Sequence, residues 1–137
     1  MQKKLKIYSD GGARGNPGPA AAAFLIISGD GVVLRAASFS LGKRTNNQAE
    51  YEALIAALES AVQLEGQEVV CHLDSELVGR QLTGEYSVRN TELKQLWCRV
   101  QELRRSFRHI SFINVPRTNK FIKEADALVN KQLDQRV

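Results

Sequence analysis

The chain has 137 residues, of which 43% are apolar and 25% charged, and its formal net charge is +4. This size and composition predict a single folded domain over residues 1–137 and exclude a chain that is disordered along its length. The longest apolar run, residues 20–27, is far shorter than the roughly 18 residues that a membrane-spanning helix needs, and residues 1–10 have no apolar signal-peptide core. We therefore expect a cytoplasmic protein with no membrane contact.

Alternation with period two predicts three strands in the first part of the chain, over residues 4–9, 21–28 and 32–40. The Gly-Asp-Gly turn between the second and third strands favours a hairpin, because these residues tolerate positive φ. A helix is predicted over residues 45–66, where apolar side chains recur at helical spacing and Gly66 is a stop signal. The first three strands would form an antiparallel meander.

Beyond this helix the pattern predicts two further strands, over residues 67–74 and 109–116, and three further helices, over residues 75–84, 91–107 and 120–134. Because a helix connects the fourth strand to the meander, that strand would lie parallel to an earlier one through a right-handed crossover. We predict an α/β fold with helices flanking a mixed five-stranded sheet, built from an antiparallel meander plus two parallel strands.

The segment SDGGARGNPGPA, residues 9–20, holds one acid among four glycines and two prolines. It predicts that the first strand ends at Asp10 and that a permissive loop follows. Such a loop could bind a phosphate, or it could place a metal ligand beside a groove. A Walker-type phosphate loop is excluded, because its GxxxxGK[ST] pattern is absent from the sequence.

Four acids are candidates for one site. Asp10 and Asp74 end predicted strands, so in parallel neighbours both would emerge at the same edge of the sheet. Glu50 flanks the apolar face of its helix; Asp126 and Glu124 border opposite edges of the last helix's apolar stripe, and spacing cannot choose between them. Converging carboxylates need a cation, and oxygen ligands suit Mg²⁺ or Mn²⁺. Taken singly, each acid also fits a turn or a helix cap.

Basic residues are concentrated between Arg80 and Lys120, where nine Lys and Arg face three acids, a local charge of +6. This half of the chain favours a polyanionic partner such as a nucleic acid. The alternative is a solvated helix face, and charge alone leaves both open.

Four segments, residues 10–20, 45–59, 74–90 and 115–130, resemble the four blocks of type I ribonuclease H, in the family's order. The resemblance implies a ribonuclease H-like fold and a metal-dependent endonuclease that hydrolyses the RNA strand of RNA/DNA hybrids by a two-metal mechanism, leaving 5′-phosphate and 3′-hydroxyl ends. Asp10, Glu50, Asp74 and Asp126 would be both the catalytic residues and the ligands of two Mg²⁺ ions, which Mn²⁺ can replace. The small residues after Asp10 would let the hybrid approach closely.

The resemblance also implies how the hybrid is bound. We expect the protein to be a monomer with no obligatory protein partner. Thr45 would grip a phosphate of the DNA strand, and minor-groove contacts near the scissile bond would come from Asn16, Asn46, Asn47 and Glu76. For these five residues, turn and cap chemistry is the competing explanation. Candidate phosphate contacts in the basic half are Arg89, Lys94, Arg104 and Arg105.

The sequence departs from the family's pattern at three places. The loop before Asp126 has no histidine, Ile122 stands where many members have asparagine, and residues 84–97 leave no room for the basic handle of larger members. The resemblance is therefore to a short form. Two alternatives to the hydrolase are a non-catalytic hybrid-binding domain, which the four acids disfavour, and a DNA strand-transferase or junction nuclease of the same superfold, which the first two segments disfavour.

Overall fold

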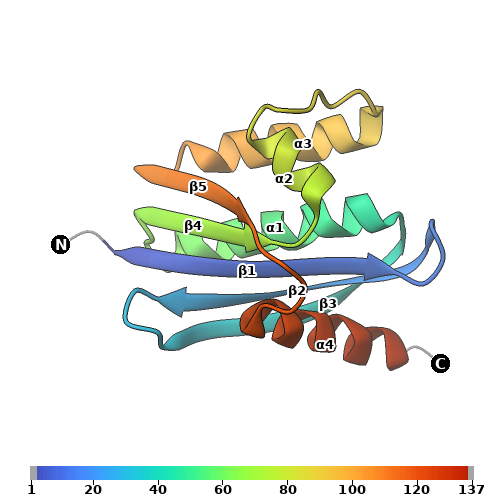
Figure 1. Cartoon of the computed structure of the whole chain (residues 1–137), viewed down its shortest axis with the longest axis horizontal. Coiled ribbons are helices and arrows are strands. Elements are labelled where there is room, and N and C mark those ends of the chain that lie inside the picture. Colours follow the sequence, from blue (N-terminus) through green and yellow to red (C-terminus); the bar gives the residue numbers. More distant parts are fainter. Residues whose placement is uncertain (1–2, 136–137) are drawn as a thin grey trace.

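The computed structural model describes residues 3–135 and contains one five-stranded sheet in the order β3-β2-β1-β4-β5 (Figure 1). The β1–β2 and β2–β3 pairs are antiparallel, whereas β1–β4 and β4–β5 are parallel. The predicted meander with two added parallel strands is thereby confirmed. The strands are β1 (Lys4–Ala13), β2 (Gly18–Ser28), β3 (Val33–Arg44), β4 (Glu68–Leu73) and β5 (His109–Asn114).

Helices cover both faces of the sheet, as Figure 1 shows. On one face, α1 and α3 form the main core with apolar side chains of the sheet such as Ile7 and Ile26. On the other, α4 packs on alanines of β2, including Ala21 and Ala23. The helices are α1 (Asn46–Gln63), α2 (Glu76–Leu82), α3 (Thr91–Arg104) and α4 (Lys120–Asp134). Within residues 3–135, no helix has the length and apolar character needed to cross a membrane.

Strand β1 is longer than predicted: it continues past Asp10 to Ala13. Backbone pairing with β2 continues through Asp10↔Ala23 to Ala13↔Ala20, so the two glycines after the acid belong to the strand. Pairing with β4 stops earlier, at Tyr8↔His72. Asp10 therefore lies just beyond the last β1–β4 pair, where the end of β4 opens the sheet.

The end of α1 also differs from the prediction. The helix ends at Gln63, before Gly66, and the left-handed residue after it is Glu65, with φ of 60°. Gly66 is needed for a different reason, since a Cβ there would lie 2.6 Å from Leu5 Cδ1. The turn between α1 and β4 thus packs directly against the first strand.

Candidate active site

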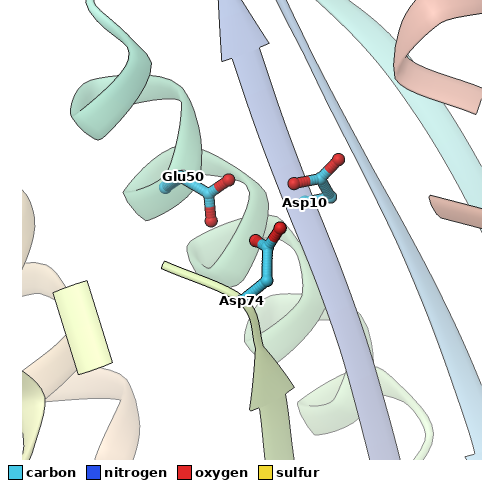
Figure 2. Close-up of side chains that lie close together, drawn as sticks. All are labelled: Asp10, Glu50 and Asp74. Atoms are coloured by element: carbon cyan, nitrogen blue, oxygen red, sulfur yellow. The ribbon is translucent and has the colours of Figure 1, made fainter. Parts of the chain in front are cut away.

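Three carboxylates from three elements converge at the carboxyl end of β4. Asp10 comes from β1, Glu50 from the start of α1, and Asp74 follows β4 directly. One oxygen of each lies within 4.8 Å of one oxygen of each other residue. Figure 2 shows the three side chains pointing toward one another. Residues far apart in the sequence therefore form one compact acidic site.

The approach of α1 to β1 places Glu50 in this site. Thr45 caps α1: its side chain accepts a hydrogen bond from the Gln48 amide over 3.2 Å. The Gly11 amide donates to Glu50 Oε1 over 3.1 Å, and a Cβ at Gly11 would lie only 2.2 Å from the Ala49 carbonyl oxygen. Gly11 therefore serves contact with α1, a role that differs from the close approach of a duplex expected from the sequence.

The turn that carries Asp74 is held from both sides. Ser75 caps α2, accepting from the Val78 amide over 3.2 Å. Asn114, at the end of β5, donates from Nδ2 to the carbonyls of Leu73 (3.3 Å) and Ser75 (2.8 Å). The sequence did not identify Asn114 as a support of this site, because Asn114 falls inside the strand predicted over residues 109–116 and the order of the strands was not known.

Asp126 lines the same cleft, of about 470 Å³, as the three converging acids. It lies on the exposed side of α4, and Asn130 Nδ2 donates to its Oδ2 over 3.3 Å. Its carboxyl group interacts with that of Asp10. Glu124 is exposed and is not among the residues that line this cleft. The structure thus distinguishes the two acids that spacing left open.

Burial and the neighbouring negative charges disfavour ionisation of Asp10 and Glu50. Burial, followed by the charges of Asp74 and Asp126, raises the pKa of Asp10 to about 7. Burial and the nearby Asp10 charge raise the pKa of Glu50 well above its usual range, despite the hydrogen bond from Gly11. A cation among them would reverse this cost. The all-oxygen donor set fits a hard divalent ion such as Mg²⁺ or Mn²⁺.

The loop before α4, which has no histidine, places Arg117 next to the acids. Arg117 Nε donates to Asp74 Oδ2 over 3.4 Å, from a side chain that is 92% exposed. Asn119 caps α4 by accepting from the amides of Phe121 and Ile122. Ile122 is buried against Tyr8 and other apolar side chains. A core residue therefore occupies position 122, and Arg117 brings a cation to the acids.

Two of the asparagines predicted to contact the minor groove, Asn16 and Asn46, also make hydrogen bonds within the protein. Asn16 Oδ1 accepts from the Asn46 amide over 2.9 Å, and Asn46 Oδ1 accepts from the Ala13 amide over 2.8 Å. Asn46 and Asn47 line the acidic cleft. The two bonds join the β1–β2 connection to the start of α1, and Asn16 holds this junction from outside the set of cleft-lining residues.

The remaining candidate contacts are spread along α2 and α3. Glu76 is exposed and forms an ion pair with Arg80, with a separation of 2.8 Å. Arg89 precedes α3. Lys94 lies in the first half of α3, with its Nζ 4.7 Å from the centroid of the Trp97 ring. This end of α3 contacts the start of α1 through the Gln48–Glu92 hydrogen bond.

Arg104 and Arg105 lie at the other end of α3. The guanidinium of Arg104 lies 5.3 Å from the Phe112 ring centroid, over β5. The structure therefore separates the four basic candidates into two pairs, with only Arg89 and Lys94 at the end of α3 that meets the start of α1.

Comparison with known proteins identifies the relatives of this fold. The Reverse transcriptase-like family matches residues 8–132. Ribonuclease HI of Halobacterium salinarum is 42% identical over 131 residues, covering 96% of this chain and 65% of that protein. The Bifunctional protein Rv2228c of Mycobacterium tuberculosis is 39% identical, and the match spans 36% of its length. The chain thus spans less than two thirds of these curated relatives.

Solved structures cover the chain more completely. The crystal structure of RNase H1 from Halobacterium salinarum has a TM-score of 0.92 at 42% identity, covering 96% of this chain and 98% of that one. LC11-RNase H1, solved in complex with an RNA/DNA hybrid, has a TM-score of 0.87 at 39% identity, with coverages of 96% and 97%. The chain therefore belongs to the Reverse transcriptase-like family and, within it, to the type I ribonucleases H.

Proposed function

We propose that this protein is a metal-dependent endonuclease that hydrolyses the RNA strand of RNA/DNA hybrids, leaving 5′-phosphate and 3′-hydroxyl ends. The observation that carries the proposal is the convergence of Asp10, Glu50 and Asp74 within 4.8 Å, beside Asp126 in an open cleft. The similarity to LC11-RNase H1, a protein solved with a hybrid bound, supports the choice of substrate.

The four acids would hold the metal, for which we propose two Mg²⁺ ions, with Mn²⁺ able to replace them. Bound there, the ions would supply an activated water and stabilise the leaving 3′-oxygen of an in-line displacement. Asp10 and Glu50 are 6% and 8% exposed, so their carboxylates are shielded from water and held in place. The Gly11 amide orients Glu50, while the more exposed Asp126 closes the cleft from α4.

The cleft edge would recognise the hybrid. We propose that Asn16, Asn46, Asn47 and Glu76 contact the minor groove, where 2′-hydroxyls distinguish RNA from DNA. Thr45 would contact a phosphate of the DNA strand, at the capped start of α1. Further phosphate contacts would come from Arg89, Lys94, Arg104 and Arg105.

A parallel digestion tests this function against its two alternatives. RNA/DNA hybrid, double-stranded RNA and a four-way DNA junction are each incubated with the protein in Mg²⁺, in Mn²⁺ and in EDTA. We expect cleavage of the hybrid's RNA strand with either metal, none in EDTA, and none by Asp10→Asn, which removes a ligand without emptying the core. Cleavage of the junction alone indicates a junction nuclease, and binding without cleavage indicates a hybrid-binding domain.

We further propose that the protein acts as a monomer in the cytoplasm. Light scattering coupled to gel filtration, at the protein concentration used for cleavage, measures the mass of the active species. A mass of twice the monomer contradicts the proposal.

A further inference from the structure

Arg14 lines the acidic cleft and lies on the connection between β1 and β2. Among the described residues that line this cleft, Arg14 and Arg117 are the two cations, and Arg117 already contacts Asp74. Figure 1 shows the β1–β2 connection at the same end of the molecule as the end of α4. Arg14 therefore lies at the cleft edge without a role in the acidic site described above.

Hydrogen bonds fix the backbone at Arg14 and at the residue before it. The Arg14 amide donates to the Pro19 carbonyl over 2.8 Å, closing the connection. The preceding Ala13 amide donates to Asn46 Oδ1 over 2.8 Å, tying it to α1. The guanidinium itself is more accessible, since the Arg14 side chain is 51% exposed. A fixed base with an exposed charged end is suited to capturing an anion at the cleft edge.

In the free protein, the guanidinium has a carboxylate partner. Arg14 Nη2 lies 2.5 Å from Oδ1 of Asp134, the last residue of α4, whose side chain is 67% exposed. An acid at the C-terminal end of a helix is opposed by the helix dipole. Exposed ion pairs contribute only about 0 to 1 kcal/mol of stability. The pair therefore does little for the fold, and another anion can replace Asp134 at small cost.

We propose that Arg14 binds a backbone phosphate of the hybrid at the cleft edge, and that Asp134 competes with this phosphate for the guanidinium. This inference rests on the proposed function and adds a binding residue to it. The planar guanidinium can hold two phosphate oxygens at once, as it can two carboxylate oxygens. Four acids repel a polyanion from the cleft, and Arg14 offsets part of that repulsion once Asp134 is displaced.

Binding of a short fluorescent RNA/DNA hybrid, measured by anisotropy in EDTA, tests the competition. Losing one phosphate contact in Arg14→Gln should weaken binding about fivefold to tenfold and reduce the slope of log affinity against log salt by about 0.9. Asp134→Asn should tighten binding about threefold, because it frees the guanidinium. In the double variant the gain should disappear, and binding should match Arg14→Gln.

Asp30→Asn is the matched charge control, because Asp30 is an exposed acid in the turn between β2 and β3. If Asp134→Asn tightens binding equally in the Arg14→Gln background, or no more than Asp30→Asn does, simple charge repulsion explains the effect and the competition is refuted. Unchanged binding by Arg14→Gln also refutes it. Cleavage by the wild-type protein is measured in parallel: a wild type that binds but does not cleave overturns the proposed activity, while the binding variants still decide the role of Arg14.

Discussion

The Gly11 amide and Glu50 Oε1 are joined by a hydrogen bond of 3.1 Å that links the central strand to the first helix. The contact depends on the missing side chain of Gly11, since α1 passes where a Cβ would stand. As a result, Glu50 lies beside Asp10, although β2 and β3 separate the two residues in the sequence. The glycine that follows the first acid thus helps to assemble the acidic site.

This relationship predicts that substitution by alanine has different effects on stability at two neighbouring glycines. Gly11→Ala would place a methyl group 2.2 Å from the Ala49 carbonyl, so β1 and α1 must separate. We expect a loss of about 1 to 3 kcal/mol in the free energy of unfolding, measured by urea denaturation, and a loss of hybrid cleavage.

Gly12→Ala is the stability control for this change. A Cβ at Gly12 meets Val129 Cγ1 at 3.7 Å, an ordinary contact. We expect its free energy of unfolding to change by about 0.5 kcal/mol or less. Equal destabilisation by the two variants would mean that the tight packing at Ala49 is not what constrains position 11.

The sequence predicted the elements well because periodicity reports which face of each element is buried. It placed Asp10 and Asp74 at one edge of the sheet for a sound reason, parallel strands, but it ended β1 too early. Glycines lower strand propensity, and only pairing with β2 shows that Gly11 and Gly12 are extended. Local patterns carry no information about such a partner.

The same limit explains the other differences. Neither the close approach of Gly11 to Ala49 nor the bonds from Asn114 to the Asp74 turn follow from spacing, because both depend on how elements far apart in the sequence pack. Spacing alone could not distinguish Asp126 from Glu124; the family resemblance favoured Asp126, and the orientation of α4 against β2 places Asp126 and not Glu124 in the cleft lining.

The raised pKa of Asp10 predicts how stability depends on pH without metal. Its pKa is about 7 in the folded protein, against 3.8 for an ordinary Asp. Between these values the folded state binds more protons than the unfolded state, so stability falls as pH rises from about 4 to about 7. The stability contributed by protonated Asp10 is present at low pH and is lost above about pH 7.

Thermal unfolding in EDTA across this range checks the prediction. Relative to the wild type, Asp10→Asn should be stabilised increasingly toward pH 8, because its side chain never ionises. Adding Mg²⁺ at pH 8 should raise the Tm of the wild type and have a smaller effect on Asp10→Asn. A Tm difference between the two proteins that stays constant from pH 5 to pH 8 would contradict the assignment of the raised pKa to Asp10.

The salt dependence of KM tests the proposed phosphate contacts at the two ends of α3. Arg89 and Lys94 lie at the end that contacts α1, whereas Arg104 lies over Phe112 of β5. Neutralising Arg89 and Lys94 together should reduce the slope of log KM against log KCl by up to about 1.8, because each lost phosphate contact contributes about 0.9.

The double change of Arg104 and Arg105 to alanine is the comparison, since it removes the same charge. If all four residues contact the hybrid, both double variants will flatten the slope. If only the Arg104 and Arg105 variant does so, the hybrid extends toward β5 and away from the start of α1.

Asp126 provides the last test, because it is the most exposed of the four acids and reaches the site from α4. Its hydrogen bond from Asn130 is long, at 3.3 Å, so its carboxylate is held less firmly than that of Glu50. We expect Asp126→Asn to lower kcat but to leave measurable activity, more in Mn²⁺ than in Mg²⁺, since Mg²⁺ demands stricter octahedral geometry. Glu124→Gln removes the same charge two residues earlier, outside the cleft, and should cleave like the wild type. An inactive Glu124→Gln beside a fully active Asp126→Asn would mean that α4 presents a different face to the acids.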